Sequence, residues 1–112
     1  MRLVTVNMAS PADDTKRALV RALEQRVVTG PGSASPELRA RAFENRDLAA
    51  PLGALIEKVA KRSFQVTDGD VAAARAAGYT EDQLFELIVC AAVGESSRQY
   101  QAGLAALAES SG

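Results

Sequence analysis

The sequence contains no histidine, no tryptophan and a single cysteine among its 112 residues. Without imidazole, this chain holds no Ser-His-Asp triad, no Cys-His pair, no HExxH zinc motif and no imidazole proton shuttle. The lone cysteine, Cys90, excludes both an internal disulfide and a CxxC redox pair. The chemistry that remains is that of carboxylates, hydroxyls, Lys and Arg side chains, or one thiol.

An excess of charge of one sign is also lacking. Thirteen Lys and Arg residues face fourteen Asp and Glu residues, which leaves a formal net charge of -1. This balance gives no long-range field, so nucleic acid is not an expected partner. The apolar content at the N-terminus is too short for a signal-peptide core or a membrane span. We therefore expect a soluble, cytoplasmic protein without a membrane partner.

What the chain does contain is a series of helix signals. The length is typical of one domain. We expect an N-terminal arm over residues 1–10, forming a short strand or lying on a neighbouring chain, and then a single helical domain over 11–110. Capping residues and apolar spacing predict an all-α bundle of five or six helices. We expect helices over about 11–28, over about ten residues after Ser35-Pro36, over 51–62 and over 71–77. A further helix begins at Thr80, with a kink or break at Gly94-Glu95, and a last one covers about 97–109.

Apolar residues three or four positions apart predict an apolar side for these helices. Capping boxes are expected at Thr67-Asp70 and at Thr80-Gln83. The stripes are Leu19, Val20, Leu23 and Val27 in the first helix, Leu52, Leu55, Ile56, Val59 and Ala60 in the helix over 51–62, and Tyr100, Leu104 and Leu107, directed inward, in the last helix.

Apolar residues and alanines dominate the helix that begins after Thr80. From Leu84 to Val93 it is apolar nearly all round, which is typical of a central, buried helix. The many alanines let helices approach closely but cover little surface, so a single copy leaves apolar surface exposed. Exposed patches of this kind indicate self-association. We expect a homo-oligomer.

The stretch over 52–107 resembles the AhpD-like (alkylhydroperoxidase), or carboxymuconolactone decarboxylase, family. The resemblance depends on order and spacing. An amphipathic helix precedes a short helix that ends in Ala76-Ala77-Gly78, and the run from Tyr79 to Leu84 is similar to the family's entry into its long buried helix. The small residues Ala91-Ala92 and the later Arg98 are similar to the small residues and the following arginine in that family's closing helices. The resemblance implies an AhpD-like helical core over about 51–109.

The family's most specific motif is a CxxC followed by a histidine, and this chain lacks it. The matching positions hold Ser63, Val66 and Asp70. Disulfide exchange needs one thiolate to attack and a second thiol to resolve the mixed disulfide. The resemblance therefore implies a member whose redox site is lost. We expect no thiol peroxidase or reductase activity, no cofactor, and a packing role for Cys90, because burial makes a thiol inert.

Two polar positions near the apolar helix are candidate site residues. Glu86 is the only charge between Leu84 and Val93, and Arg98 on the following helix is its expected partner. The pair predicts a polar spot on an apolar cavity wall that binds or protonates a small apolar or anionic ligand. The alternative is that Glu86 lies on a solvated edge of its helix. Arg98 also belongs to a second polar cluster with Ser96, Ser97 and Tyr100, which indicates either an anion-binding group or hydrogen bonds between helices.

Other charged residues favour plain structural roles. Asp68 and Asp70 offer too few oxygens for a calcium loop and are interpreted as helix-capping residues, so no metal site is expected. The basic residues Arg17, Arg21, Arg39 and Arg41 are scattered among acids and are interpreted as a solvated face.

Three functions remain open from the sequence. The first is a non-catalytic AhpD-like homo-oligomer with a role in assembly or small-ligand binding. The second is an enzyme of the lactone or small-acid decarboxylase or isomerase type, with Glu86 and Arg98 as its candidate catalytic residues in an apolar cavity. The third is a helical module that docks a different protein.

Overall fold

The computed structural model describes residues 11–111, and over this range it is entirely helical. The all-α prediction is confirmed, whereas the expected N-terminal strand or arm lies outside the described residues. The elements are α2 (Pro11–Thr29), α3 (Pro36–Glu44), α4 (Leu52–Lys61), a 3-10 turn η1 (Ser63–Gln65), α5 (Asp68–Ala76) and α6 (Glu81–Ser111).

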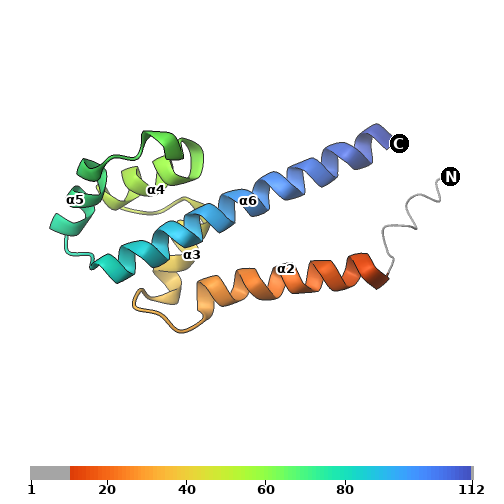
Figure 1. The fold of residues 1–112 in the computed structure, drawn as a ribbon, viewed down its shortest axis with the longest axis horizontal. Helices are drawn as coiled ribbons and strands as arrows, with labels where there is room; N and C mark the ends of the chain where they lie inside the picture. The colour runs from red at the N-terminus through yellow and green to blue at the C-terminus, as the bar shows by residue number, and fades with distance from the viewer. Residues whose placement is uncertain (1–10, 112) are drawn as a thin grey trace.

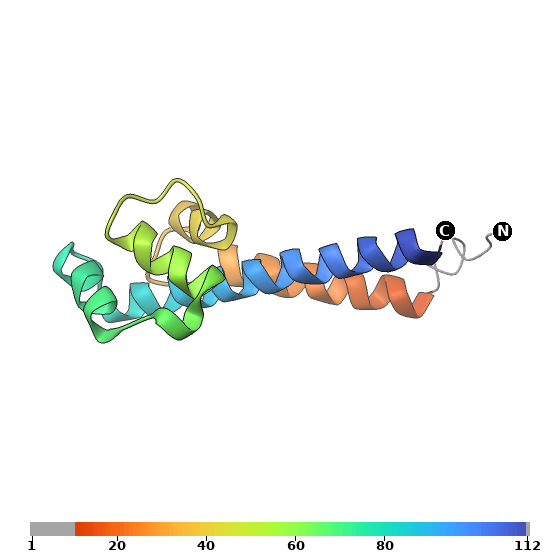
Figure 2. The same ribbon diagram turned by 90° about the horizontal axis from the view of Figure 1, so that it is seen from above.

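Helices α2 and α6 run antiparallel along the long axis, and the three shorter helices gather at one end (Figures 1 and 2). The described chain measures 57 × 28 × 20 Å, with a radius of gyration of 17.0 Å. A compact chain of this length has a radius of gyration of about 13 Å. The extra length comes from a two-helix stalk, residues 14–26 of α2 and 99–110 of α6. We refer to residues 27–98 as the head.

The hydrophobic core lies entirely within the head. Leu55 and Ile56 of α4 and Leu87 and Cys90 of α6 are completely buried. The predicted stripe of α4 faces this core, because its apolar residues repeat every three or four positions and so share one side of the helix. The first half of α6 is the central helix that its composition predicted.

The expected break near Gly94 is wrong, because α6 continues unbroken over Glu81–Ser111. A Cβ atom added at Gly94 would overlap the carbonyl oxygen of Phe43 at the end of α3. Glycine at this position therefore permits close packing of two helices and does not end one. The predicted separate helix over 97–109 is the second half of the same helix.

Local capping signals are confirmed. Thr67 and Asp70 form a reciprocal capping box at the start of α5, and Thr80 and Gln83 exchange the same pair of hydrogen bonds before α6. Ser35 caps α3 by accepting from the backbone N–H of Leu38. These contacts join residues three positions apart, which is why the sequence alone revealed them.

The predicted inward direction of Tyr100 and Leu107 is wrong. Tyr100 is 51% exposed and Leu107 is 64% exposed, because the second half of α6 extends beyond the head. On α2, Leu19 and Leu23 of the expected stripe are 65% and 59% exposed. In the described part of the chain, no helix combines the length and the hydropathy that crossing a membrane requires.

Candidate functional site

Glu86 of α6 holds the loop that connects α2 to α3. Its carboxylate accepts hydrogen bonds from the backbone N–H groups of Ser33 at 2.7 Å and Ala34 at 2.8 Å. Gly32 leaves room for this approach, since a Cβ there would lie 2.8 Å from Glu86 Oε1. The N–H groups of Ser33 and Ala34, together with the nearby charge of Arg39, lower the pKa of Glu86. The carboxylate therefore remains ionised and attached to the loop at neutral pH.

Arg39 of α3 also contacts the loop between α2 and α3. It is only 4% exposed, so the expectation that it belongs to a solvated face is wrong. Its guanidinium donates to the carbonyl oxygens of Ala34 at 3.1 Å and Val27 at 3.2 Å. A buried guanidinium needs such acceptors because an unsatisfied buried charge is costly. Arg39 thus binds the carbonyl groups of the loop and of the end of α2, while Glu86 binds the N–H groups of the loop.

Cys90 packs against the same end of α2. The residue is fully buried, and its Sγ lies 3.5 Å from the carbonyl oxygen of Val27. Burial raises the pKa of the Cys90 thiol above its usual range. A protonated, inaccessible thiol is a poor nucleophile.

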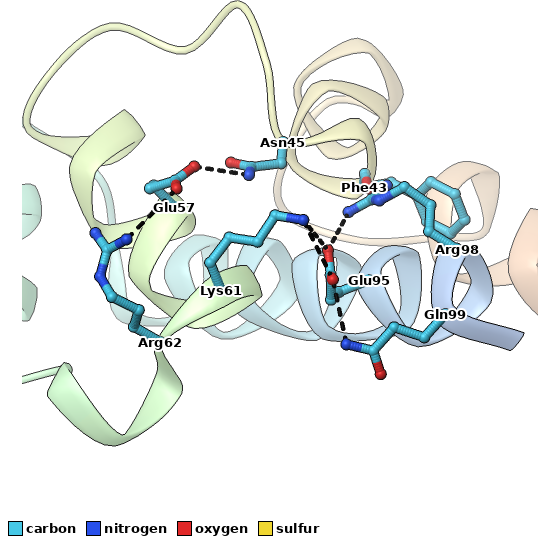
Figure 3. Close-up of polar contacts among 8 residues, drawn as sticks. All are labelled: Phe43, Asn45, Glu57, Lys61, Arg62, Glu95, Arg98 and Gln99. Carbon is cyan, nitrogen blue, oxygen red and sulfur yellow. Dashed lines mark hydrogen bonds and ion pairs between the residues drawn. The ribbon is translucent and has the colours of Figure 1, made fainter. Parts of the chain in front are cut away.

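A second polar cluster surrounds Glu95, where α6 passes α3 and α4 (Figure 3). The Glu95 carboxylate pairs with Lys61 at 3.1 Å and with Arg98 at 3.1 Å, and it accepts a hydrogen bond from Gln99 at 3.3 Å. Arg98 also donates to the carbonyl oxygen of Phe43 at 2.7 Å. The contacts with Lys61 and Arg98 lower the pKa of Glu95. This cluster joins three helices. Glu95 was not predicted as a site residue, because its contact with Lys61 spans 34 positions of the sequence.

The expected pair between Glu86 and Arg98 does not form. Both residues lie on α6, twelve positions apart, which corresponds to about 18 Å along the helix axis. Each already binds other groups, Glu86 the loop and Arg98 the end of α3. Tyr100 lies farther along, on the stalk. The structure therefore does not bring the three predicted ligand-binding residues to one cavity.

The three positions that match the family's redox motif lie at the junction of η1 and α5. Ser63 begins η1, Val66 follows its last residue, and Asp70 is the third residue of α5. Asp70 pairs with Lys58 at 3.0 Å in addition to its capping contact. The backbone N–H of Thr67 and the ammonium of Lys58 lower the pKa of Asp70.

No metal site accompanies this junction. Asp70 acts as a capping residue, as predicted, and Asp68 lies beside it in the first turn of α5. Over the portion that the structure describes, no three His, Cys, Asp or Glu residues come together in a way that could hold a metal ion.

One cavity of about 460 Å³ lies on the stalk, where α2 faces the second half of α6. A four-residue period on each helix places its lining side chains on the two facing sides. The groove was not predicted from the sequence, because Arg17 and Arg21 were assigned to a solvated face. The lining residues are Arg17, Val20, Arg21, Glu24, Tyr100, Gln101, Leu104 and Ala105.

Comparisons of the chain with protein-family models, with curated proteins and with solved structures found no match. Assignment of a function therefore depends on the geometry of this chain.

Proposed function

We propose that the protein is a non-catalytic helical assembly protein that associates with further copies of itself through the stalk. The observation that carries this proposal is the composition of the exposed stalk. Residues 99–108 contain no charged side chain, and apart from the half-buried Leu104 they are exposed. An exposed helical surface without charge is poorly solvated, and such a surface is typical of protein interfaces.

The facing helix contributes large apolar side chains. Leu19 and Leu23 of α2 are more than half exposed and lie four positions apart, so they share one side of the helix. An isolated helix pair of this length is marginal in water, because most helical stability comes from packing of an apolar face. Contact with another helix pair would bury these side chains. Each Å² of apolar surface removed from water would favour association by about 25 cal/mol.

A second copy of the same chain is the simplest partner for this surface. Two antiparallel helix pairs form a four-helix bundle when their apolar sides meet. A twofold axis lets each copy supply the same surface to the other, which closes the assembly without leaving a free apolar edge. The small residues Ala102, Gly103 and Ala106 would permit close approach of the helices.

The chemistry of the head supports a non-catalytic role. The positions that the resemblance assigns to the redox motif hold Ser63 and Val66, and the lone thiol of Cys90 is buried. In our proposal the chain is an AhpD-like protein that has kept a helical scaffold without its thiol chemistry. The decarboxylase or isomerase alternative has less support, because Glu86 binds loop amides and lies far from Arg98.

Size-exclusion chromatography with light scattering tests self-association. The wild-type chain should elute with the mass of two or more chains, in a fixed whole number. A Leu19→Glu/Leu23→Glu variant should elute as a single chain, because two carboxylates would have to be desolvated at the interface. Circular dichroism should show that its helical content is retained.

A matched control places the same two charges on exposed apolar residues of the head. Phe64 on η1 is 85% exposed and Phe85 on α6 is 70% exposed, and Phe64→Glu/Phe85→Glu should keep the wild-type mass. A wild-type protein that remains a single chain up to the highest soluble concentration would overturn the proposal and favour a module that docks a different protein. An unchanged mass for the stalk variant would overturn it as well.

A further inference from the structure

The groove between the stalk helices is lined by both apolar and cationic side chains. Val20, Leu104 and Ala105 supply the apolar lining. Arg17 and Arg21 lie one helical turn apart on the same side of α2, at the same groove. Its volume of about 460 Å³ falls within the range of small-molecule cavities.

The two guanidinium groups are available to a ligand. Among the residues that the structure describes, neither Arg17 nor Arg21 takes part in an ion pair, in contrast with Lys58, Lys61 and Arg98 of the head. Guanidinium forks bind carboxylates through paired, charge-assisted hydrogen bonds. Tyr100 and Gln101 on the facing helix add a hydroxyl and an amide at the groove.

We propose that this groove binds a small amphipathic carboxylate, with its carboxylate at Arg17 and Arg21 and its apolar tail on Val20, Leu104 and Ala105. Glu24 also lines the groove, so the two guanidinium groups leave a net charge of one positive unit. This charge favours a monoanion over a neutral alcohol and disfavours an alkylammonium ion.

The groove and the surface that we assign to self-association share residues of α6, but they use different sides of α2. Leu19 and Leu23 are not among its lining residues, and on a helix they project to a different side from Arg17 and Arg21. The groove also lies within one copy of the chain. This inference therefore goes beyond the proposed function and does not depend on it.

Titration of the full-length, isotopically labelled chain with sodium octanoate tests the proposal. Amide chemical-shift changes in the NMR spectrum should concentrate on residues 17–24 and 100–105. Isothermal titration calorimetry should give tighter binding of octanoate than of octan-1-ol or octylammonium. Octanoate that binds no tighter than octan-1-ol, or that perturbs the head and not the stalk, would overturn the proposal.

Variants separate the charged contact from the apolar one. Arg17→Gln/Arg21→Gln should weaken octanoate binding at least tenfold and leave octan-1-ol binding unchanged. The matched control is Lys16→Gln, which removes a neighbouring charge of α2 that does not line the groove and should leave octanoate binding unchanged. Equal weakening by the control would show unspecific attraction of the anion and would overturn the proposal.

Failure of this proposal is distinguishable from failure of self-association. The arginine variant should keep the wild-type mass in light scattering, whereas Leu19→Glu/Leu23→Glu should lose that mass and still bind octanoate. Loss of octanoate binding in the leucine variant would contradict the assignment of the groove to a single copy.

Discussion

The head and the stalk are built from the same two long helices, yet they are stabilised differently. In the head, α6 is surrounded by α3, α4 and α5, and its residues Leu87 and Cys90 are completely buried. In the stalk, α2 is the one described element that the same helix faces, and of its residues 99–110 Leu104 alone is half-buried. The difference shows that helix formation and core formation are separate: α6 remains helical where it has almost nothing to pack against.

Polar contacts follow the same division. Glu86, Glu95 and Arg39 each connect α6 or the loop after α2 to distant parts of the head. Within the described part of the stalk, Arg17 and Arg21 take part in no ion pair, and Leu19 and Leu23 are exposed. The head is therefore stabilised internally, and the stalk presents a surface that is available to a partner or a ligand.

Removal of a leucine side chain should show the largest difference in stability between the head and the stalk. Leu87→Ala should lower the free energy of unfolding by about 3 kcal/mol, because it leaves a cavity in the core. Leu23→Ala, on the 59% exposed leucine of the stalk, should change it by less than about 0.5 kcal/mol in the single-chain state. Urea unfolding at a concentration at which light scattering gives one chain measures both values. Equal losses would show that the stalk contains a core of its own.

Glycine-to-alanine substitutions on α6 should have opposite signs in the two regions. Gly94→Ala should destabilise the head by about 2 kcal/mol, because the new methyl group overlaps the carbonyl oxygen of Phe43. In the single-chain state, Gly103→Ala should stabilise the fold by about 0.5–1 kcal/mol, because the site is open there and alanine favours the helix. The thermal unfolding midpoints of the two variants provide the measurement. A stabilising Gly94→Ala would contradict the close approach of α3 and α6.

Loss of the charge on Glu86 should have a smaller effect that depends on pH. Glu86→Gln should lower the free energy of unfolding by about 1.5 kcal/mol at neutral pH. The NH₂ group of glutamine replaces one of the two oxygens that accept hydrogen bonds from the loop. Glu81→Gln is the matched control, since Glu81 forms only an exposed ion pair with Arg75, and it should cost less than about 0.5 kcal/mol.

The direction of the pH effect follows from the lowered pKa of Glu86. A carboxylate with a folded-state pKa below its unfolded value stabilises the fold above the unfolded pKa, and that contribution is lost as the pH falls through the folded pKa. The difference in unfolding free energy between wild type and Glu86→Gln should therefore have its largest value above about pH 5 and decrease below about pH 4.5. A difference that stays constant from pH 7 to pH 3 would show that Glu86 acts through packing and not through its charge.

Much of the fold followed from local signals. The capping boxes at Thr67 and Thr80, the apolar stripe of α4 and the buried first half of α6 were all predicted, because each depends on residues within one or two turns of each other. The candidate site was predicted less well. Glu86 was identified as unusual, but its partners, Ser33 and Ala34, lie more than fifty positions away in the sequence.

The sequence by itself determined that the chain is helical and that histidine and dithiol chemistry are excluded, because composition and short-range capping decide both. Only the tertiary structure decided that Gly94 lies inside a continuous helix, that Arg39 is buried, and that Arg17 and Arg21 share a groove with Tyr100. Those outcomes depend on which helices pack together and at what separation. Such pairings are set by shape and burial across the whole chain, and no short stretch of sequence encodes them.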